Sequence, residues 1–420
     1  MIISFKPNCS LLCLRACTFT GCGGNEQPAN PMPNVKGQKS TFALHLQKSA
    51  KCGMIRMENC APICARTLNP DGFNEMKNIY LISTGGTIAC VPTDNGLKPE
   101  LSARELLNLV RGETSNCAGS TCEGAKQCSV FGNVHCVDLF SMDSSNIQPE
   151  EWITIAEAIN QYADKCDGIV LTHGTDTMAY TASMLSFMLA GIRIPVVLTG
   201  AQYPAVYPDS DGRRNLENAI IAATALTGGV YICFGNSLML GCRAVKTRTT
   251  SLNAFESINY PYIGTVSDGR MLALHSPQVR SEYSFSTDID PRVALIKLIP
   301  GLSPKLLDCC LDCDIKGVVV EAFGLGGMHS IRRNHLKAIE RLMANDIPVI
   351  LTSQCLYEQS TPDIYEVSRP LKELGIISAG DMTTEAAITK LMWVLGHTSG
   401  IDGVRNMMQT NLVGELTQKD

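Results

Sequence analysis

The 420-residue sequence has no long hydrophobic run, no long basic run and little charge imbalance. No stretch approaches the ~18 consecutive apolar residues that a membrane-spanning helix needs. The formal net charge is −5, so nothing electrostatic indicates a nucleic-acid or anionic-membrane partner. With 45% hydrophobic and 18% charged residues, the composition is typical of a packed globular protein and argues against general disorder.

The sequence also lacks the spacing of a disulfide framework, although it contains 19 cysteines. The total is odd, and several cysteines fall inside expected strands and helices, which is typical of reduced, buried thiols in a cytosol. One group of cysteines could in principle bind a metal but lacks the paired C-x-x-C spacing of structural zinc sites: Cys117, Cys122, Cys128 and Cys136. We therefore expect a cytoplasmic protein without a metal site.

The first 75 residues lack helical or strand periodicity. The apolar run at Leu11–Leu14 is short and is followed by Arg15, which fits the core of a signal peptide poorly. We expect residues 1–75 to be a disordered or dispensable extension, with Met76 as an internal start. An export or anchoring segment is the alternative.

From Met76 onward, apolar strand patterns alternate with amphipathic helix patterns, which predicts parallel sheets covered on both faces. The expected strands are Asn78–Ser83, Val134–Phe140, Gly168–Thr172, Ile194–Gly200, Gly229–Phe234, Ala294–Ile299, Gly317–Ala322 and Pro348–Thr352. The expected helices are Pro149–Lys165, Thr177–Ala190, Arg213–Leu226, Pro304–Asp312, Arg333–Ala344, Thr384–Leu395 and Gly403–Met408.

The regular pattern lapses around Ser257–Asp290, where Tyr, Pro, Ser, Asp and Gly predominate. The fold class predicted is α/β, with two tandem open parallel-sheet domains joined by a linker. The larger N-terminal domain spans residues 76–260, the linker 261–291 and the smaller C-terminal domain 292–420. The second domain is long enough to bury a core of its own.

A glycine-rich turn follows the first expected strand, at Thr84-Gly85-Gly86-Thr87. Paired glycines allow a sharp turn and bring backbone N–H groups close to a ligand. The motif lacks the G-x-G-x-x-G spacing of a dinucleotide site and the lysine of a phosphate loop. Taken alone, it fits a tight turn with capping threonines equally well. A second glycine-rich stretch, Gly324-Leu325-Gly326-Gly327, favours a tight turn over a phosphate loop.

Further polar residues follow other expected strands, at His173-Gly174-Thr175-Asp176-Thr177 and at Lys246. Asp176 and Thr177 have a helix-capping alternative, His173 is better explained as a buried, hydrogen-bonded imidazole, and Lys246 has a surface alternative. Ligands collect at the carboxyl ends of parallel strands. A threonine hydroxyl is a poor nucleophile without a base, and a lysine oriented by a carboxylate can supply one. These residues therefore make chemical sense together.

Two stretches, at this separation, resemble the signature motifs of the asparaginase/glutaminase family: Thr84-Gly85-Gly86-Thr87-Ile88-Ala89 and His173-Gly174-Thr175-Asp176-Thr177-Met178. The likeness runs from about Lys77 to the C-terminus. Other stretches resemble the cytoplasmic, type I branch: Met142-Asp143-Ser144-Ser145, Ser210-Asp211-Gly212 with Asn215, Ala379-Gly380-Asp381-Met382-Thr383, and Asn411-Leu412-Val413-Gly414-Glu415-Leu416.

The resemblance implies hydrolysis of L-asparagine to L-aspartate and ammonia, without a cofactor, in a homodimer or homotetramer. Thr87 matches the family's nucleophile, and Thr175, Lys246 and Asp176 match its second, triad-like set. Attack on an amide builds an oxyanion, which N–H groups of the glycine-rich turn and of Thr175 can stabilise. Which threonine attacks stays open. The residues that match the substrate-binding set are Gly86, Asp143, Ser144, Ser145, Thr175 and Asp176.

The sequence departs from the family pattern in the lid that follows the first motif. Members commonly carry a tyrosine there, which supports the nucleophile, whereas Val91–Pro99 contains none and Leu97 occupies about that place. Closure of the lid or activation of Thr87 must then depend on another group.

Three alternatives to an asparaginase remain open. A glutaminase differs in substrate by one methylene, which a pocket distinguishes by only ~1–3 kcal/mol. A tRNA-dependent amidotransferase subunit would need a partner and an ordered N-terminal domain. A catalytically silent amino-acid sensor would bind without turnover, although Thr87, Thr175, Asp176 and Lys246 are all present.

Overall fold

The computed structural model describes residues 76–112, 132–277, 282–360, 371 and 373–417. The expected extension 1–75 and the cysteines Cys117, Cys122 and Cys128 lie outside them. Phe73–Asp420 forms one compact unit, whose described elements make two large sheets and three two-stranded ones.

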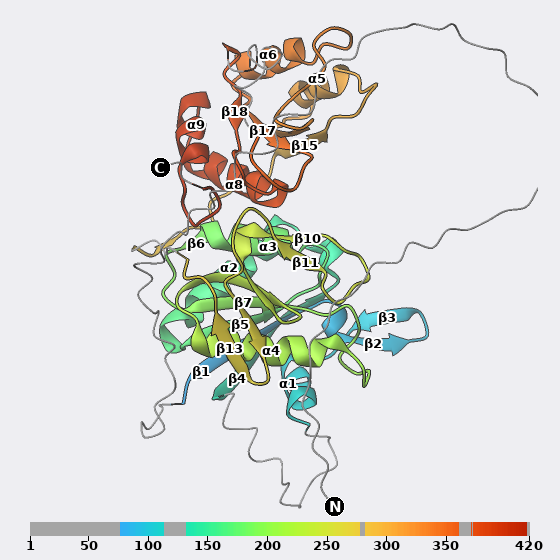
Figure 1. Cartoon of the computed structure of the whole chain (residues 1–420), viewed down its shortest axis with the longest axis vertical. Helices are drawn as coiled ribbons and strands as arrows, with labels where there is room; N and C mark the ends of the chain where they lie inside the picture. Colours follow the sequence, from blue (N-terminus) through green and yellow to red (C-terminus); the bar gives the residue numbers. More distant parts are fainter. Residues whose placement is uncertain (1–75, 113–131, 278–281, 361–370, 372, 418–420) are drawn as a thin grey trace, which may run out of the picture. The chain divides into compact units, whose positions relative to one another are not determined.

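The larger sheet has eight strands in the order β13-β12-β9-β8-β7-β5-β1-β4 (Figure 1). From β4 to β8 the neighbouring strands are parallel, whereas β9, β12 and β13 extend the sheet in an antiparallel manner. The strands are β1 Asn78–Gly85, β4 Asn133–Met142, β5 Gly168–Thr172, β7 Pro195–Thr199, β8 Gly229–Phe234, β9 Ser237–Leu240, β12 Gly264–Ser267 and β13 Arg270–Ala273.

Helices cover both faces of this sheet, α1 and α4 on one face and α2 and α3 on the other (Figure 1). Their starts are capped as the local sequence dictates: the Ser102 and Ser210 hydroxyls accept backbone N–H groups at the first turns of α1 and α4. The helices are α1 Ala103–Arg111, α2 Pro149–Tyr162, α3 Met178–Met188 and α4 Asp211–Ala225.

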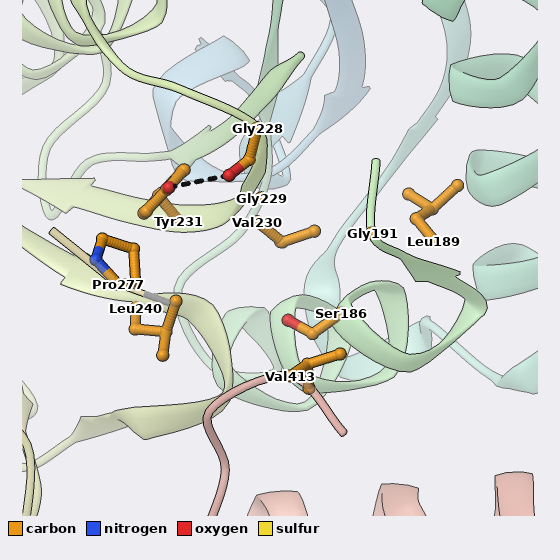
Figure 2. Close-up of a pocket in the computed structure, with 10 residues that line it drawn as sticks. All are labelled: Ser186, Leu189, Gly191, Gly228, Gly229, Val230, Tyr231, Leu240, Pro277 and Val413. Carbon is orange, nitrogen blue, oxygen red and sulfur yellow. Dashed lines mark hydrogen bonds between the residues drawn. The ribbon is translucent and has the colours of Figure 1, made fainter. Parts of the chain in front are cut away.

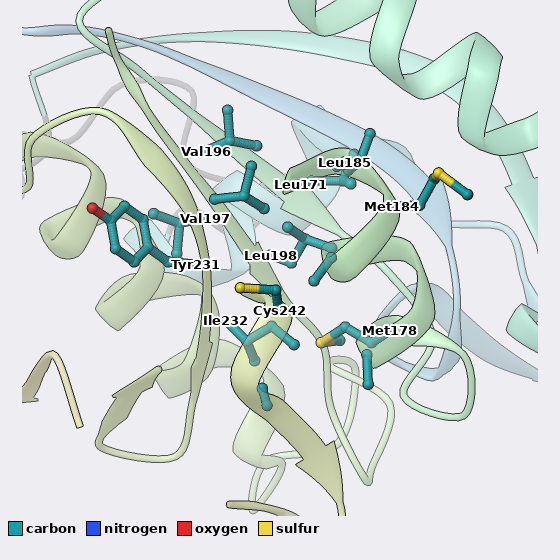
Figure 3. Packing of buried hydrophobic residues seen from close by; sticks show 14 of the residues in the cluster. Leu171, Met178, Met184, Leu185, Val196, Val197, Leu198, Tyr231, Ile232 and Cys242 are labelled. Atoms are coloured by element: carbon teal, nitrogen blue, oxygen red, sulfur yellow. The ribbon is translucent and has the colours of Figure 1, made fainter. Parts of the chain in front are cut away.

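The main core lies between the sheet and these helices. The central strand β5 is buried along its whole length, which explains its unbroken apolar run. Figure 3 shows Met178 and Leu185 of α3 gathered with Leu171, Leu198 and other side chains of β5, β7 and β8. Since α3 is buried on nearly every side, its sequence shows no polar stripe.

The smaller sheet is entirely parallel, in the order β15-β16-β17-β18. Helices α5 and α6 pack together on it, and α8 contacts its strands as well as α3 of the first sheet. Its elements are β15 Val293–Lys297, β16 Gly317–Ala322, β17 Val349–Ser353, β18 Ile377–Ser378, α5 Lys305–Asp312, α6 Leu336–Ala344, α8 Thr384–His397 and α9 Ile401–Gln409.

Short elements complete the described fold. The pairs of antiparallel strands are β2 Cys90–Thr93 with β3 Gly96–Pro99, β10 Ala244–Lys246 with β11 Phe255–Ser257, and β6 Leu189–Ala190 with β14 Ser284–Phe285. The 3-10 turns are η1 Thr87–Ala89, η3 Ser144–Asn146, η4 Ala163–Lys165 and η5 Gly241–Arg243.

The predicted α/β class with two sheets is confirmed, and the boundaries of β5, β8 and β16 match those expected. Three features differ. The large sheet is mixed rather than wholly parallel, because β9, β12 and β13 continue it beyond β8. The segment expected to be a linker contains β12 and β13, whose short alternating strands resemble loop sequence. The helix expected to reach Ala190 ends at Met188, where the chain pairs with β14.

Within the described ranges, no helix is long and apolar enough to cross a membrane. The nine described cysteines are free thiols, and the described residues include no cluster of His, Cys, Asp or Glu side chains that could hold a metal ion. They are not all buried, however: Cys309, Cys313 and Cys355 are exposed.

Candidate active site

The two sequence motifs meet where β1 and β5, the central parallel strands, reach their carboxyl ends. Ser83 pairs with Thr172 across the strands, so the chain after β1 lies beside the chain after β5. The Thr84 hydroxyl donates to Thr172 O at 2.8 Å and closes this junction. The other neighbour of β1 is β4, whose last residue, Met142, accepts a hydrogen bond from Gly86 N at 2.9 Å. Three polar loops therefore gather at one edge.

Glycines allow these loops to touch through their backbones. Gly86 has φ +74°, and a Cβ added there would lie 2.3 Å from Gly174 N. At Gly174, a Cβ would lie 2.6 Å from Ser144 Oγ. Both glycines are therefore required by close approach, and Gly86 also by its left-handed backbone. Gly86 therefore fulfils both expectations from the sequence: it forms a tight turn, and it lies where the two motifs meet.

Ser144, which is buried, joins the second motif to the loop after β4. Its hydroxyl accepts from Asp176 N at 3.2 Å, and its carbonyl accepts from the Thr177 hydroxyl at 2.8 Å. Thr177 thus bonds to this loop, not to its own helix, and makes no side-chain cap to α3.

Asp143 and Ser145 flank this junction and are both exposed. The Asp143 carboxylate accepts from Ser145 N at 2.9 Å and also from the Ser145 hydroxyl. These two hydrogen bonds favour the charged carboxylate and lower the pKa of Asp143. An ionised group is therefore available at the mouth of the site.

Lys246 reaches the second motif from the end of β10. Its Nζ donates to Thr175 Oγ1 at 2.7 Å and to Asp176 Oδ1 at 2.6 Å. The lysine side chain is 16% exposed and that of Asp176 is 66% exposed, so the pair faces solvent on the carboxylate side. The structure therefore brings together Thr175, Asp176 and Lys246, as the sequence predicts.

Thr87 lies at the start of η1, directly after Gly86, and is partly exposed. Its hydroxyl has no hydrogen-bond partner among the described residues, so it is free to meet a ligand. The hairpin β2–β3 follows it. At the base of the hairpin, Ala89 O accepts from Glu100 N and Leu101 N. Leu97 is 52% exposed on β3 and, in this conformation, is a solvent-facing side chain.

Two motifs for which the sequence predicted no role hold β10 in place. Arg243, three residues before Lys246, is fully buried and donates to Gly414 O at 2.7 Å and to Asp381 Oδ2 at 3.0 Å. Asp381 also accepts from Thr417 N at 2.9 Å, and its pKa is lowered by its hydrogen bonds from Thr417 and by the charge of Arg243, which together outweigh burial. The stretches around Asp381 and Gly414 thus anchor the strand that carries Lys246.

The motif around Asp211 supports a neighbouring loop. Its carboxylate accepts from Gln202 N and Tyr203 N at 3.0–3.1 Å and from Asn215 Nδ2 at 3.0 Å. Asn215 also donates to Gly200 O at 2.9 Å, directly after β7. The role of this motif is to order backbone at the same edge of the sheet.

Two hollows elsewhere do not include the predicted site residues. Figure 2 shows a pocket lined by Ser186, Tyr231, Val413 and others, where Tyr231 Oη donates to Gly228 O at 3.0 Å. Its volume of about 30 Å³ accommodates water but no amino acid. A wider polar hollow of about 690 Å³ includes Arg248 and Glu256, beside β11.

Comparisons with known proteins match both halves of the described chain to family models. A family model described as "Asparaginase, N-terminal" matches residues 78–279, and one described as "Glutaminase/Asparaginase C-terminal domain" matches residues 292–408. The solved structure of the thermostable L-asparaginase from Thermococcus kodakarensis is similar with a TM-score of 0.74 and 41% identity. The match covers 81% of this chain and 100% of that one.

Two curated relatives differ in how much of their own length is matched. The L-asparaginase of Thermococcus kodakarensis is 42% identical over 342 residues, covering 81% of this chain and 99% of that protein. A subunit of the glutamyl-tRNA(Gln) amidotransferase of Methanosphaera stadtmanae is 34% identical over 362 residues, covering 82% of this chain and 77% of that protein.

Proposed function

The chain belongs to the asparaginase family, and on that premise we propose that it is an amidohydrolase that converts L-asparagine to L-aspartate and ammonia. The observation that carries the proposal is the bridge from Lys246 Nζ to Thr175 Oγ1 and Asp176 Oδ1, beside the loop that holds Thr87. A lysine held between a hydroxyl and a carboxylate can handle the proton of a threonine nucleophile.

In the proposed reaction, a threonine Oγ attacks the side-chain amide carbon, and the free hydroxyl of Thr87 supports assigning it this role. The carbonyl oxygen becomes an oxyanion, which backbone N–H groups stabilise. The C–N bond then breaks, the nitrogen takes a proton and leaves as ammonia, and water cleaves the resulting aspartyl ester. Lys246 and Asp176 move the protons through Thr175.

Charged groups at the edge of the site support recognition of the amino-acid end of the substrate. Asp143 and Asp176 are exposed carboxylates able to meet an α-ammonium group, and the Ser144 hydroxyl, which accepts from Asp176 N, keeps its own proton to donate to an α-carboxylate. Gly86 lets the loop that carries Thr87 lie directly against the second motif, because a Cβ there would lie 2.3 Å from Gly174 N.

The alternative of an amidotransferase subunit has weaker support. The chain spans 99% of its asparaginase relative but 77% of its amidotransferase relative, which therefore has a further part that the match does not include. A glutaminase remains the alternative within hydrolases, since one methylene separates the substrates.

We also propose a cytoplasmic homodimer or homotetramer. Free thiols throughout the described residues support a reducing compartment. Tyr203 and Tyr207 are 51% and 41% exposed on the loop ordered by Asp211, and such exposed aromatics support a subunit contact there. Light scattering after size-exclusion chromatography tests the assembly, and a monomer at micromolar concentration would contradict it.

The first test is ammonia release from L-asparagine and L-glutamine by the full-length protein. We expect asparagine turnover that Thr87→Ala and Thr175→Ala both abolish. Thr247→Ala is the matched control, because that hydroxyl donates to Glu256 at 3.1 Å and lies outside the proposed machinery. A protein starting at Met76 tests whether residues 1–75 are dispensable. Asparagine binding without turnover would instead support the silent sensor.

A further inference from the structure

A buried chain of hydrogen bonds begins at α2 and ends on the backbone of the second motif. Trp152 Nε1 donates to Thr181 Oγ1 at 3.0 Å, and the same oxygen lies 3.0 Å from His173 Nε2. His173 Nδ1 lies 2.7 Å from Gly174 O. Thr181 and His173 are fully buried and Trp152 nearly so, so no solvent competes for these bonds.

The chemistry of the hydrogen-bonding partners determines which atom carries each proton in this hydrogen-bond network. A carbonyl oxygen only accepts, so Nδ1 of His173 carries a hydrogen and donates to Gly174 O. Burial lowers the pKa of His173 to about 4, so the ring is neutral near pH 7 and Nε2 accepts. The Thr181 hydroxyl therefore donates to Nε2 while it accepts from the indole of Trp152. The tautomer of His173 is therefore determined: Nδ1 carries the hydrogen and Nε2 does not.

The peptide that His173 holds is the one that joins Gly174 to Thr175. In a trans peptide, the N–H of Thr175 points to the side opposite Gly174 O, and the described chain has no cis peptide. Thr175 is only 6% exposed, yet its N–H has no hydrogen-bond partner among the described residues. The next N–H, that of Asp176, is bound to Ser144. The N–H of Thr175 is thus a backbone donor of a buried residue that has no partner among the described residues, and it lies beside the hydroxyl that Lys246 binds.

We propose that His173 is a positioning residue, which fixes the Gly174–Thr175 peptide so that the Thr175 N–H meets the oxyanion formed on the substrate amide. This inference rests on the proposed amidohydrolase function. His173 itself touches no substrate; it acts through the peptide. Thr181 holds the imidazole in the required tautomer, and Trp152 in turn orients Thr181.

A donor that acts on the oxyanion should affect kcat more than KM, because the interaction strengthens as charge develops. Removing one such donor typically lowers kcat by about 10²–10³-fold, and misplacing it lowers kcat by less. A role limited to packing would instead lower the melting temperature and the folded fraction, without changing kcat per folded molecule.

The decisive experiment compares Thr181→Val with Thr181→Ser in the full-length protein. Valine matches threonine in shape but cannot donate to Nε2, so the imidazole is free to adopt the other tautomer, whose Nδ1 would repel Gly174 O. We expect Thr181→Val to lower kcat for asparagine by about 10-fold or more with KM within about 2-fold, and Thr181→Ser to restore kcat.

A second pair tests the same peptide from the histidine. In His173→Asn the amide nitrogen takes the place of Nδ1 and can still donate to Gly174 O, whereas His173→Leu has no donor. We expect His173→Asn to keep a higher kcat per folded molecule than His173→Leu. Circular dichroism measures the folded fraction of each variant. This pair decides the matter if Thr181→Val does not fold.

The outcomes separate this inference from the function on which it rests. An active wild type whose kcat is unchanged in Thr181→Val and in His173→Leu overturns the positioning role alone. Equal falls in kcat for His173→Asn and His173→Leu, in proportion to their loss of fold, overturn it as well. A wild type without amide turnover overturns the proposed function and this inference together.

Discussion

In each of the two large sheets a parallel strand ends in a glycine-rich turn, but only the turn after β1 has a glycine packed against the backbone of a neighbouring loop. After β1, a Cβ on Gly86 would lie 2.3 Å from the backbone of Gly174. After β16, Gly324 has φ +51°, yet a Cβ there would meet nothing within 4 Å. That turn closes on itself through the bridge between Phe323 and Gly327, as its sequence predicted.

The polar groups at the carboxyl ends of the parallel strands also differ between the two large sheets. At the first edge, Lys246 joins Thr175 and Asp176 from a separate strand. At the second, Glu321 of β16 is satisfied by Lys297 at 3.3 Å and by Thr384 at 2.8 Å, both within the packing of that sheet. A glycine-rich turn at the end of a parallel strand is therefore not enough to form a site. A site also needs several loops that approach closely and polar groups that remain available to a ligand.

The largest expected effect separates a site lysine from a structural one. Lys246→Met should lower kcat by about 10²–10⁴-fold with little change in stability, since its partner Asp176 is exposed. Lys390, fully buried against Glu415 at 2.6 Å, should behave in the opposite way. Lys390→Met leaves a buried carboxylate unpaired, which costs about 3–5 kcal/mol.

Steady-state kinetics and urea unfolding on both lysine variants measure the two effects. Adding Glu415→Leu to Lys390→Met should recover stability, because no unpaired charge then remains. A folded Lys390→Met enzyme that has lost turnover would break the distinction between the two lysines.

The second-largest expected effect distinguishes the glycine-rich turn after β1 from the one after β16. Gly86→Ala places a methyl group against Gly174 and should lower kcat by about 10²-fold, because a displacement of ~1 Å at a site has this cost. Gly324→Ala has open space and should lose only about 1–2 kcal/mol of stability from its left-handed backbone, with kcat retained. Equal kcat losses in both variants would mean that close approach is not what distinguishes the turns.

Lowering the pH should lower the free energy of unfolding through His173, which directly follows β5. Its pKa is about 4 in the folded chain against an ordinary 6.5, because burial disfavours the charged ring. The unfolded chain therefore binds this proton first, so the stability present above pH 6.5 is lost progressively as the pH falls towards 4, by about 3 kcal/mol. Urea unfolding at pH 7 and pH 4 should show a smaller difference in His173→Asn, and the exposed His135→Gln serves as the control.

The smallest effect concerns the lid beside the first edge. Leu97 is exposed on β3, at about the place where the family resemblance of the sequence led us to expect a tyrosine. Leu97→Tyr should raise kcat by a few-fold, since a phenol adds a hydrogen-bonding group to a hairpin that adjoins Thr87. Leu97→Phe adds the ring without the hydroxyl. If both variants raise kcat equally, packing of the lid and not the hydroxyl is responsible.

The amino-acid sequence by itself determined the α/β class and the strands β5, β8 and β16, and it singled out the four residues Thr87, Thr175, Asp176 and Lys246. These features depend on short-range patterns: buried parallel strands have unbroken apolar runs, and glycine-rich turns follow them. The antiparallel strands β9, β12 and β13 escaped prediction because brief alternating segments become strands only when a neighbouring edge offers its hydrogen bonds.

Only the tertiary structure decided which atoms of these polar groups meet and which buried groups hold them in place. Lys246 lies 70 residues from Asp176, and Arg243 lies 138 residues from Asp381, so neither contact leaves a mark in local periodicity. The sequence favoured a buried, hydrogen-bonded imidazole at His173, but only the structure shows that its partners are the Thr181 hydroxyl and the carbonyl of Gly174. Sheet register and backbone approach bring these groups within hydrogen-bonding distance, and both are set by packing across the whole unit.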